Sequence, residues 1–420
     1  MADEEITGFQ DVGAETANRD VRGGNNNLHQ ARQAKKDEFY TQYSDIQNEV
    51  NAYIEYNPDV FRNKTILLPC DDPEWSNFTK FFAQNFERYG IKKLISTSYA
   101  IESKNLPDDY DYQPTLFETK DPRFDIDRTR IKGKIFTLEK DSDNSGRIDI
   151  NDLKWDYLEG DGDFRSDEVK KLRDEADFIV TNPPFSLFKE FLAWIVEADK
   201  KFLIIGNQNA ITYKEVFPLI MNNETWLGPS IHSGDREFRV PSTYPLNAAS
   251  CREDEHGNRF IRVKGVRWFT NIDHGRRHKP LSLMPMSDNI RYSKHKEVKG
   301  QEYQKYDNYE AIEVPFTDAI PSDYDGIMGV PITFLDKYCP EQFEILGATQ
   351  RGCHDLVPDI KKYDDYWEMR QDGSPTGSSG SKTNENANLL QNDGKKNYFI
   401  NAEGRIVQSA YQRLFIRRKE

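Results

Sequence analysis

The 420-residue sequence lacks the features that mark several classes of protein. Its four cysteines, Cys70, Cys251, Cys339 and Cys353, show no CxxC spacing, which favours reduced thiols over a disulfide framework or a zinc site. It has no run of eighteen apolar residues and no charged-then-apolar N-terminus. We therefore expect neither a membrane span nor a secretory signal, and a cytoplasmic location.

The chain also lacks an excess of positive charge. Lys and Arg number 57 against 71 Asp and Glu, which gives a formal net charge of −14. This balance argues against a uniformly basic coat for nucleic acid but leaves room for a locally basic face. The length and the 36% of hydrophobic residues favour two domains over one.

Composition changes along the chain indicate how it is divided. Residues 1–30 have little apolar periodicity and predict a mobile tail. Residues 371–396 are low in complexity and predict a loop, followed by a hairpin that turns at Glu403-Gly404. We predict a catalytic domain over residues 31–275 and a C-terminal region over residues 276–420.

Within the first domain, apolar runs typical of buried strands alternate with helical patterns. A phenylalanine-rich helix is expected to have Asp72 as N-cap and Pro73 as first residue, and to end at Gly90. Ser186 is the expected cap of a second helix. The predicted strands lie at residues 65–70, 92–97, 177–181 and 201–206.

This alternation of strand and helix predicts an α/β fold with right-handed crossovers and a doubly wound, mostly parallel sheet. Two aromatic and β-branched segments, residues 225–228 and 266–272, predict an antiparallel pair at the edge of that sheet.

The strongest chemical signal is Asn182-Pro183-Pro184-Phe185, directly after the third predicted strand. Ligands of open α/β sheets bind at the carboxyl ends of strands, so the tetrapeptide stands where chemistry is expected. The Asn182 amide oxygen and the Pro183 carbonyl oxygen offer two acceptors to one amino group, and Phe185 offers a stacking face. This combination suits a planar ring whose exocyclic amine receives a methyl group. A rigid strand-to-helix turn is the alternative.

In these residues the chain resembles the amino-methyltransferases that use S-adenosylmethionine, and within them the EcoRI-type adenine-specific DNA methyltransferases. The resemblance covers most of the chain from about residue 35 onward and implies a class I methyltransferase fold (Rossmann-like, with an antiparallel edge hairpin) plus a C-terminal DNA-recognition region. The blocks that carry it, in order, are DEFYTQ (37–42), CDDP (70–73), GDGDFRS (160–166) and NPPFSLF (182–188).

The resemblance also implies a site for S-adenosylmethionine. The DEFYTQ block would contact its methionine end, whereas Asp163 would accept from its adenine amine and Phe164 would pack on the ring. The CDDP block has no glycine-rich loop, so Asp71 and Asp72 would pair with the ammonium group, capping by Asp72 being the alternative. The implied cofactor residues are Tyr40, Thr41, Cys70, Asp71, Asp72, Pro73, Asn77, Asp163 and Phe164.

A base inside a duplex cannot reach a buried site, so such an enzyme must extrude it and hold the DNA backbone with positive charge. Residues 259–299 carry eleven Lys or Arg and three Asp or Glu, a local net charge of +8. An ordinary ion-paired surface is the alternative. The residues predicted to bind DNA are Arg267, Arg276, Arg277, Lys279, Arg291, Lys294 and Lys296.

Residues 141–152 match the spacing of a calcium loop, with Gly146 at the sharp turn. The twelfth position is Asp152 where glutamate is usual, and the preceding segment has the pattern of a strand. We therefore favour a β-hairpin turn over a calcium site and predict no metal.

Together these features predict a site-specific enzyme that transfers a methyl group from S-adenosylmethionine to N6 of a flipped adenine in duplex DNA. The expected setting is a restriction-modification system, or a solitary or phage-borne methylase, with or without a cognate restriction endonuclease and without a stable complex. The alternatives are methylation of RNA or of a protein glutamine, and a catalytically inactive DNA-binding relative.

Overall fold

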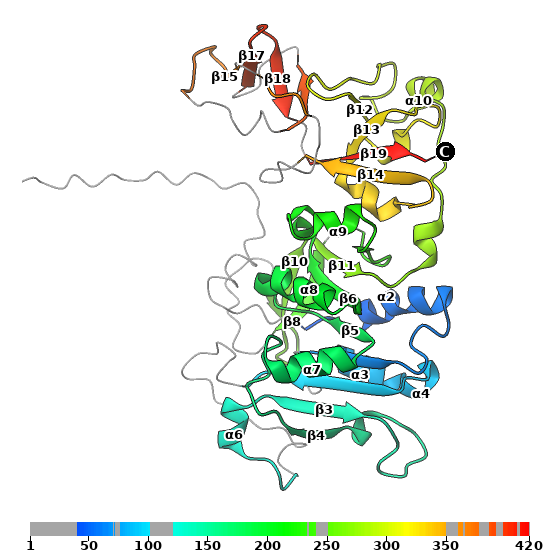
Figure 1. Ribbon diagram of the computed structural model, residues 1–420, viewed down its shortest axis with the longest axis vertical. Helices are drawn as coiled ribbons and strands as arrows, with labels where there is room; N and C mark the ends of the chain where they lie inside the picture. The colour runs from blue at the N-terminus through cyan, green and yellow to red at the C-terminus, as the bar shows by residue number, and fades with distance from the viewer. Residues whose placement is uncertain are drawn as a thin grey trace, which may run out of the picture.

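The structure is a computed structural model that describes residues 40–69, 71, 76–100, 121–232, 235–240, 251–349, 360–363, 366–377, 386–391, 398–409 and 412–419. The predicted tail at residues 1–30 lies outside these residues. In the described part of the chain, no helix is long and apolar enough to cross a membrane. Figure 1 shows a large sheet in one half of the molecule and smaller sheets, built from the C-terminal region, in the other.

The large sheet has eight strands in the order β4-β3-β2-β1-β5-β6-β11-β7. Neighbours among β2, β1, β5 and β6 are parallel, whereas β3 pairs antiparallel with β2 and β4, and β11 pairs antiparallel with β6 and β7. The strands are β1 (Thr65–Leu68), β2 (Lys93–Ser98), β3 (Lys134–Leu138), β4 (Lys154–Tyr157), β5 (Phe178–Thr181), β6 (Lys201–Asn207), β7 (Trp226–Leu227) and β11 (Val266–Thr270).

The four strands predicted from apolar runs are therefore confirmed, with ends that differ by at most two residues. The predicted antiparallel edge pair is β7 and β11, where Leu227 lies opposite Phe269. The antiparallel strands β3 and β4 on the other edge confirm the hairpin that we favoured around residues 141–152.

Helices cover both faces of this sheet, as the fold class predicts. Alternate residues of β1 show why, because Leu67 packs in one core cluster with α7 and α8, and Ile66 packs in another with α2 and α3. The described helices are α2 (Tyr43–Tyr56), α3 (Asn77–Gln84), α4 (Phe86–Tyr89), α6 (Ile126–Ile131), α7 (Asp167–Glu175), α8 (Phe188–Glu197), α9 (Phe217–Met221) and α10 (Met286–Tyr292).

Two predicted helix starts differ from the structure. The phenylalanine-rich helix begins at Asn77, where Ser76 caps it by accepting from the Phe78 amide, while Asp72 and Pro73 lie outside the described residues. Ser186 does not cap α8, because a 3₁₀ turn, η2 (Phe185–Leu187), intervenes before the helix. Gly90 ends the helical segment in the left-handed conformation, as predicted.

The remaining strands form three smaller sheets, β8-β10-β9, β12-β13-β19-β14 and β15-β17-β18-β16. Gly404 turns the predicted hairpin between β17 and β18. In the described part of the predicted loop at residues 371–396, residues 388–390 form the strand β16, which pairs with β18, and the buried Asn388 donates its amide to the Asn308 side chain. The strands are β8 (Asp235–Val240), β9 (Cys251–Glu253), β10 (Arg259–Lys264), β12 (Ala311–Glu313), β13 (Ile327–Pro331), β14 (Phe343–Ala348), β15 (Tyr366–Met369), β16 (Asn388–Leu390), β17 (Tyr398–Asn401), β18 (Ile406–Ser409) and β19 (Arg413–Arg418).

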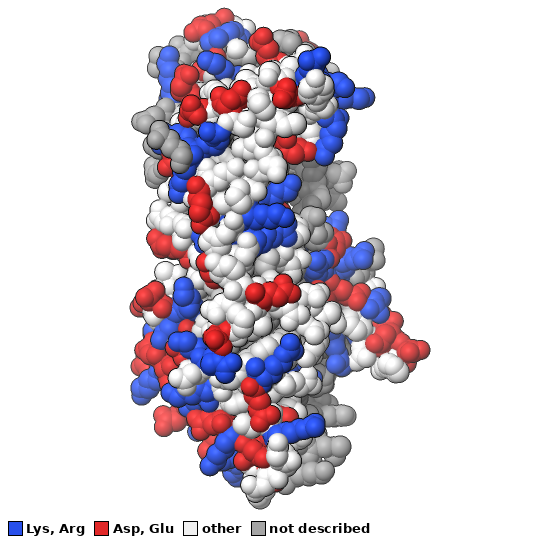
Figure 2. Space-filling view, turned by 90° about the vertical axis from the view of Figure 1, so that its right-hand side faces the viewer, with Lys and Arg blue, Asp and Glu red and all other residues white. Residues whose placement is uncertain are grey.

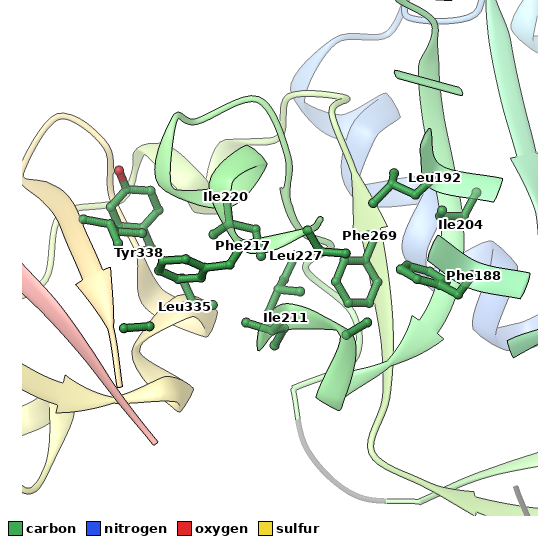
Figure 3. Packing of buried hydrophobic residues seen from close by; sticks show 14 of the residues in the cluster. Phe188, Leu192, Ile204, Ile211, Phe217, Ile220, Leu227, Phe269, Leu335 and Tyr338 are labelled. Carbon is green, nitrogen blue, oxygen red and sulfur yellow. The ribbon is translucent and has the colours of Figure 1, made fainter. Parts of the chain in front are cut away.

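One apolar cluster continues from the large sheet into the C-terminal region. Phe217 and Ile220 of α9 lie beside Leu335 and Tyr338, as Figure 3 shows. The two predicted parts of the chain therefore share a core.

Candidate active site

The NPPF tetrapeptide lies at the carboxyl edge of the large sheet, next to the end of β1. Thr181, the last residue of β5, donates its side-chain hydroxyl to the main-chain oxygen of Pro69 at 2.9 Å. Asn182 is half-buried directly after it, and Pro183 is buried. This hydrogen bond fixes the start of the tetrapeptide beside the residues that follow β1.

The N-terminal segment reaches the same edge. The Asn77 side chain, at the start of α3, donates to the main-chain oxygen of Thr41 at 2.7 Å. Thr41 is only 3% exposed, and its buried hydroxyl has no hydrogen-bond partner in the described structure. A buried hydroxyl without a partner is costly, so it marks a position where a polar ligand group fits.

Asp71 is buried between β1 and α3. Its carboxylate accepts from the Ser76 hydroxyl at 2.7 Å, and its main-chain oxygen accepts from the hydroxyls of Thr79 and Ser96. Ser76 thus both caps α3 and orients Asp71. This cap was not predicted from the sequence, although a serine directly before an apolar helix is a recognisable signal for one. Cys70, Asp72 and Pro73 lie outside the described residues.

The GDGDF loop lies at the end of β2. The Ala100 amide donates to the main-chain oxygen of Asp161 at 2.7 Å, and Gly162 has a φ of 89°. A Cβ at Gly162 would stand 2.4 Å from the Ser98 oxygen, so only glycine allows the loop to approach the strand this closely. The loop therefore lies at the same sheet edge as NPPF.

Within that loop, Asp163 and Phe164 make contacts inside the protein. Arg165 binds both carboxylate oxygens of Asp163, at 2.9 and 2.6 Å, and these hydrogen bonds hold the pKa of Asp163 below its ordinary value. Phe164 is 0% exposed and packs edge-on against Phe191 and Trp194. The predicted packing of Phe164 on the cofactor's adenine is therefore wrong, because its ring is enclosed by the core; the predicted role of Asp163 stays a prediction.

Phe185 is half-buried beside a second aromatic ring that sequence reasoning missed. Its centroid lies 6.4 Å from that of Phe238, with the planes at 88°. Phe238 belongs to β8. In the next residue of that strand, Arg239, the main-chain oxygen accepts from the Tyr40 amide at 2.9 Å and the amide donates to the Tyr40 oxygen at 3.1 Å. Charged and apolar residues alternate only over residues 237–240, which is too short a signal to predict this strand.

Two of the predicted DNA contacts are interior residues. Arg267 is 2% exposed, donates to the Ile231 main-chain oxygen at 2.7 Å and pairs with Asp336 at 3.1 Å. Arg277 is buried with its guanidinium 3.7 Å from the centroid of the Trp226 ring. The assignment of both to DNA binding is wrong, because neither guanidinium is accessible to a phosphate.

The other predicted DNA contacts are exposed. They come after β11 in the chain, and β11 ends at the edge of the sheet opposite NPPF. Thr270, the last residue of β11, pairs with Leu203 near the start of β6, which is the edge opposite Asn182. Figure 2 shows basic and acidic side chains intermingled on the face that carries α10. The binding of DNA phosphates by these exposed residues stays a prediction. The residues concerned are Arg276, Lys279, Arg291, Lys294 and Lys296, of which Lys294 pairs with Asp318.

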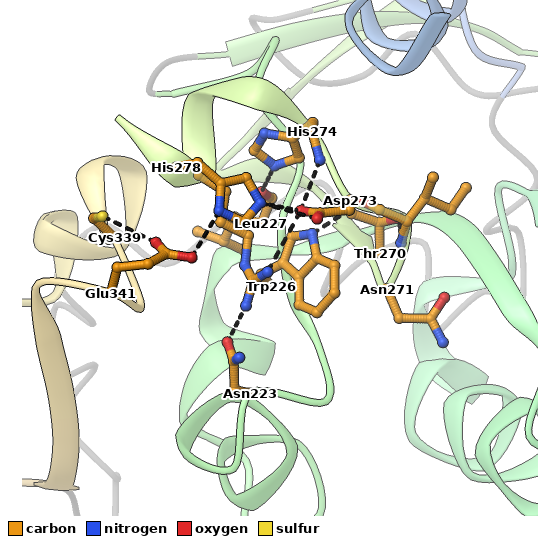
Figure 4. A network of polar contacts seen from close by, with 12 residues as sticks. Asn223, Trp226, Leu227, Thr270, Asn271, Asp273, His274, His278, Cys339 and Glu341 are labelled. Carbon is orange, nitrogen blue, oxygen red and sulfur yellow. Dashed lines mark hydrogen bonds and ion pairs between the residues drawn. The ribbon is translucent and has the colours of Figure 1, made fainter. Parts of the chain in front are cut away.

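A polar network occupies that opposite edge. His278 binds Asp273 through one ring nitrogen and Glu341 through the other, each at 2.8 Å, as Figure 4 shows. Cys339 donates to Glu341 at 3.2 Å. These contacts join the end of the large sheet to the C-terminal region.

The acidic turn between β3 and β4 brings three carboxylates together. Ligand atoms of Asp141, Asp143 and Asp152 lie within 4.8 Å of one another. Each carboxylate accepts main-chain amides of the turn, for example Gly146 to Asp141 at 2.8 Å. Hydrogen bonds of this kind are what a β-hairpin turn of this composition requires.

Comparison with known proteins identifies the family of this chain. Residues 27–419 match the model of the family described as "Adenine-specific methyltransferase EcoRI". The chain belongs to this family. The resemblance to EcoRI-type adenine-specific DNA methyltransferases, and the assignment of an enzyme, are thereby confirmed.

Three relatives are similar over most of their own length. The chain is 44% identical to the Type II methyltransferase M.EcoRI of Escherichia coli over 321 residues, which cover 76% of this chain and 88% of the relative. It is 33% identical to M.MgeORF184P of Mycoplasma genitalium and to M.MpnI of Mycoplasma pneumoniae, each over 76% of this chain and over 85% and 84% of the relative. No solved structure matches the chain.

Proposed function

We propose that this enzyme transfers a methyl group from S-adenosylmethionine to N6 of an adenine that has been flipped out of duplex DNA. The observation that carries the proposal is the Thr181–Pro69 hydrogen bond, which holds the NPPF tetrapeptide beside the end of β1. A methyl acceptor held by NPPF and a cofactor held after β1 would then be neighbours.

In this proposal NPPF binds the adenine. The Asn182 amide oxygen and the Pro183 main-chain oxygen accept the two hydrogens of the amine, which favours the pyramidal nitrogen with an available lone pair. Phe185 stacks on the base, and the edge-to-face contact with Phe238 holds the Phe185 ring in place. Positioning and electrostatics therefore replace a strong general base.

The cofactor supplies an electrophilic methyl group on a sulfonium. The residues at the carboxyl edge fit it, because the Thr41 hydroxyl is buried without a partner in the described structure. Thr41 and the Asp71 carboxylate also both bind the start of α3, through Asn77 and Ser76. Thr41 would donate to the carboxylate of its methionine end, and Asp71 would attract its ammonium group. Tyr40 and Asn77 would hold Thr41 in place, and Asp163 would lie toward its adenine.

The strand order supports a class I methyltransferase fold, since an antiparallel β11 lies between β6 and β7 at the end of a parallel sheet. The C-terminal region would recognise the DNA sequence. In Figure 1, β15, β17 and β18 lie on the side toward which β1 and β5 run. We place the enzyme in the cytoplasm and in a restriction-modification setting, with or without a cognate endonuclease.

The proposed function is tested by incubating the protein with S-adenosylmethionine carrying a labelled methyl group and, separately, genomic DNA, RNA and total protein. Mass spectrometry of the nucleosides should find the label in N6-methyladenine from the DNA only. Label in RNA or in protein glutamine would replace the proposal by one of its alternatives, and no transfer to any of them would contradict it.

A further inference from the structure

The three-stranded sheet β8-β10-β9 projects from the edge that carries NPPF. Val266 at the start of β11 pairs with Asn207 at the end of β6, and only Gly265 separates β11 from β10. The Asn207 side chain also donates to the main-chain oxygen of Lys264 at 3.1 Å. The end of β10 at Lys264 therefore lies at the carboxyl edge of the large sheet. It is next to the start of β11, which is two strands away from β5 and Asn182.

The inner face of this small sheet is part of the core behind the candidate base site. Phe238, Val240, Ile261 and Val263 are all buried in one apolar cluster, and Phe185 packs against that cluster. Side chains alternate between the faces of a strand, so this packing determines which residues face outward. It also brings the sheet into contact with Phe185 of the tetrapeptide.

The outer face is rich in positive charge. It carries four basic and two acidic side chains, whereas the whole chain has a net charge of −14. Arg252 lies over the Phe260 ring, 4.3 Å from its centroid, and binds both carboxylate oxygens of Glu237. The charged residues of this face are Arg239, Arg252, Arg262, Lys264, Asp235 and Glu237.

Arg262 and Lys264 are accessible members of this face, and Arg262 lies 4.0 Å from the Asp235 carboxylate, at the limit of an ion pair. Both are exposed, and they are two residues apart on the same side of β10. Their backbone spacing is roughly 7 Å, since a strand rises about 3.4 Å per residue. Neighbouring phosphates along one strand of B-DNA are separated by about the same distance, because they turn about the axis as well as rise.

We infer that the outer face of β8-β10-β9 binds the phosphates of duplex DNA beside the flipped adenine, chiefly through Arg262 and Lys264. This inference rests on the proposed function, which sets the base in the NPPF site. The partner is a DNA backbone because the face is net positive in an acidic protein and adjoins that site. The exposed basic residues that follow β11 come after the end of that strand, which lies at the edge of the sheet opposite NPPF.

The test compares duplex binding by the wild-type protein and by Arg262→Gln/Lys264→Gln. Anisotropy of a fluorescein-labelled duplex of mixed sequence is measured at several KCl concentrations. We expect the affinity near 0.1 M salt to fall roughly tenfold to a hundredfold, and the slope of log affinity against log salt to become shallower by about two, because each phosphate contact contributes about 0.9.

The matched control is Arg88→Gln/Lys92→Gln, which also removes one Arg and one Lys but lies at the amino end of β2. It should keep the wild-type slope, as should the charge-preserving Arg262→Lys/Lys264→Arg. A wild-type slope in Arg262→Gln/Lys264→Gln, or the same loss in the charge-preserving variant, would overturn the inference.

Two further measurements separate this inference from the proposed function. Calorimetric binding of S-adenosylmethionine by Arg262→Gln/Lys264→Gln should equal that of the wild type, which shows an intact catalytic domain. If the wild-type protein transfers no label to DNA while the variant still loses duplex affinity, the proposed function fails and the DNA surface stands.

Discussion

Single residues at the carboxyl edge show that burial and hydrogen bonding, which a sequence does not display, decide what a side chain is available to do. Thr41 and Phe164 were both expected to contact the cofactor. Thr41 is buried with an unpaired hydroxyl, and Phe164 is enclosed by aromatic neighbours. Thr41 therefore keeps a polar group that a ligand can satisfy, whereas the Phe164 ring has no surface left for one.

Thr41→Val should weaken the binding of S-adenosylmethionine by about tenfold, because it removes one hydrogen bond to a charged group of the cofactor and keeps the shape of the side chain. Isothermal titration calorimetry measures the change. The matched control is Thr225→Val, which removes another buried hydroxyl without a partner, just before β7. Equal affinities in the wild type and in Thr41→Val would remove Thr41 from the cofactor site.

At the scale of elements, strands were easier to predict than helix ends. Buried parallel strands are continuous apolar runs, so four of them were found from composition alone. The start of α8 was missed because NPPF leads into a 3₁₀ turn, and β8 was missed because its charged outer face breaks the apolar pattern. The contact of α2 with the loop after β7 has no signal in the sequence at all.

That contact depends on Glu49, a buried carboxyl group on α2. It accepts from the Ser230 amide at 2.9 Å and from the Tyr53 hydroxyl at 2.6 Å, and burial raises its pKa to about 7. Because this pKa is above the unfolded value of 4.5, the native state binds the proton more tightly. The associated stability is present below pH 4.5 and is lost as the pH rises through 7.

The wild type should therefore lose about 3 kcal/mol more unfolding free energy between pH 4.5 and 7.5 than Glu49→Gln, which has no carboxyl group at this position. Urea denaturation at a series of pH values measures it, and the difference between the two proteins cancels the other carboxyl groups. Parallel curves for the two proteins would show that Glu49 is ionised in the native state.

For the whole molecule, the C-terminal region is joined to the large sheet by a shared core and by one buried ion pair. Arg267 on β11 pairs with Asp336 on η6 (Ile332–Lys337). The residue before Asp336, Leu335, belongs to the apolar cluster of Figure 3. Arg267 was predicted to belong to a basic surface because an interior arginine and an exposed arginine look the same in a sequence.

Arg267→Met should destabilise the protein by about 3 kcal/mol, because it leaves the Asp336 carboxylate, whose side chain is only 12% exposed, without the guanidinium that pairs with it. Arg267→Met/Asp336→Leu, which removes both charges, should recover most of that loss. Chemical denaturation measures both variants. If the double variant is as unstable as the single one, the ion pair does not account for the effect.

The central claim is that the Asn182 amide binds the amine that receives the methyl group. The most direct test measures the methylation rate and the duplex affinity of Asn182→Ala, with Asn222→Ala, an exposed asparagine at the end of α9, as the control. The methylation rate of Asn182→Ala should fall at least about a hundredfold, while its duplex affinity should stay at the wild-type value. A wild-type rate in Asn182→Ala would contradict it.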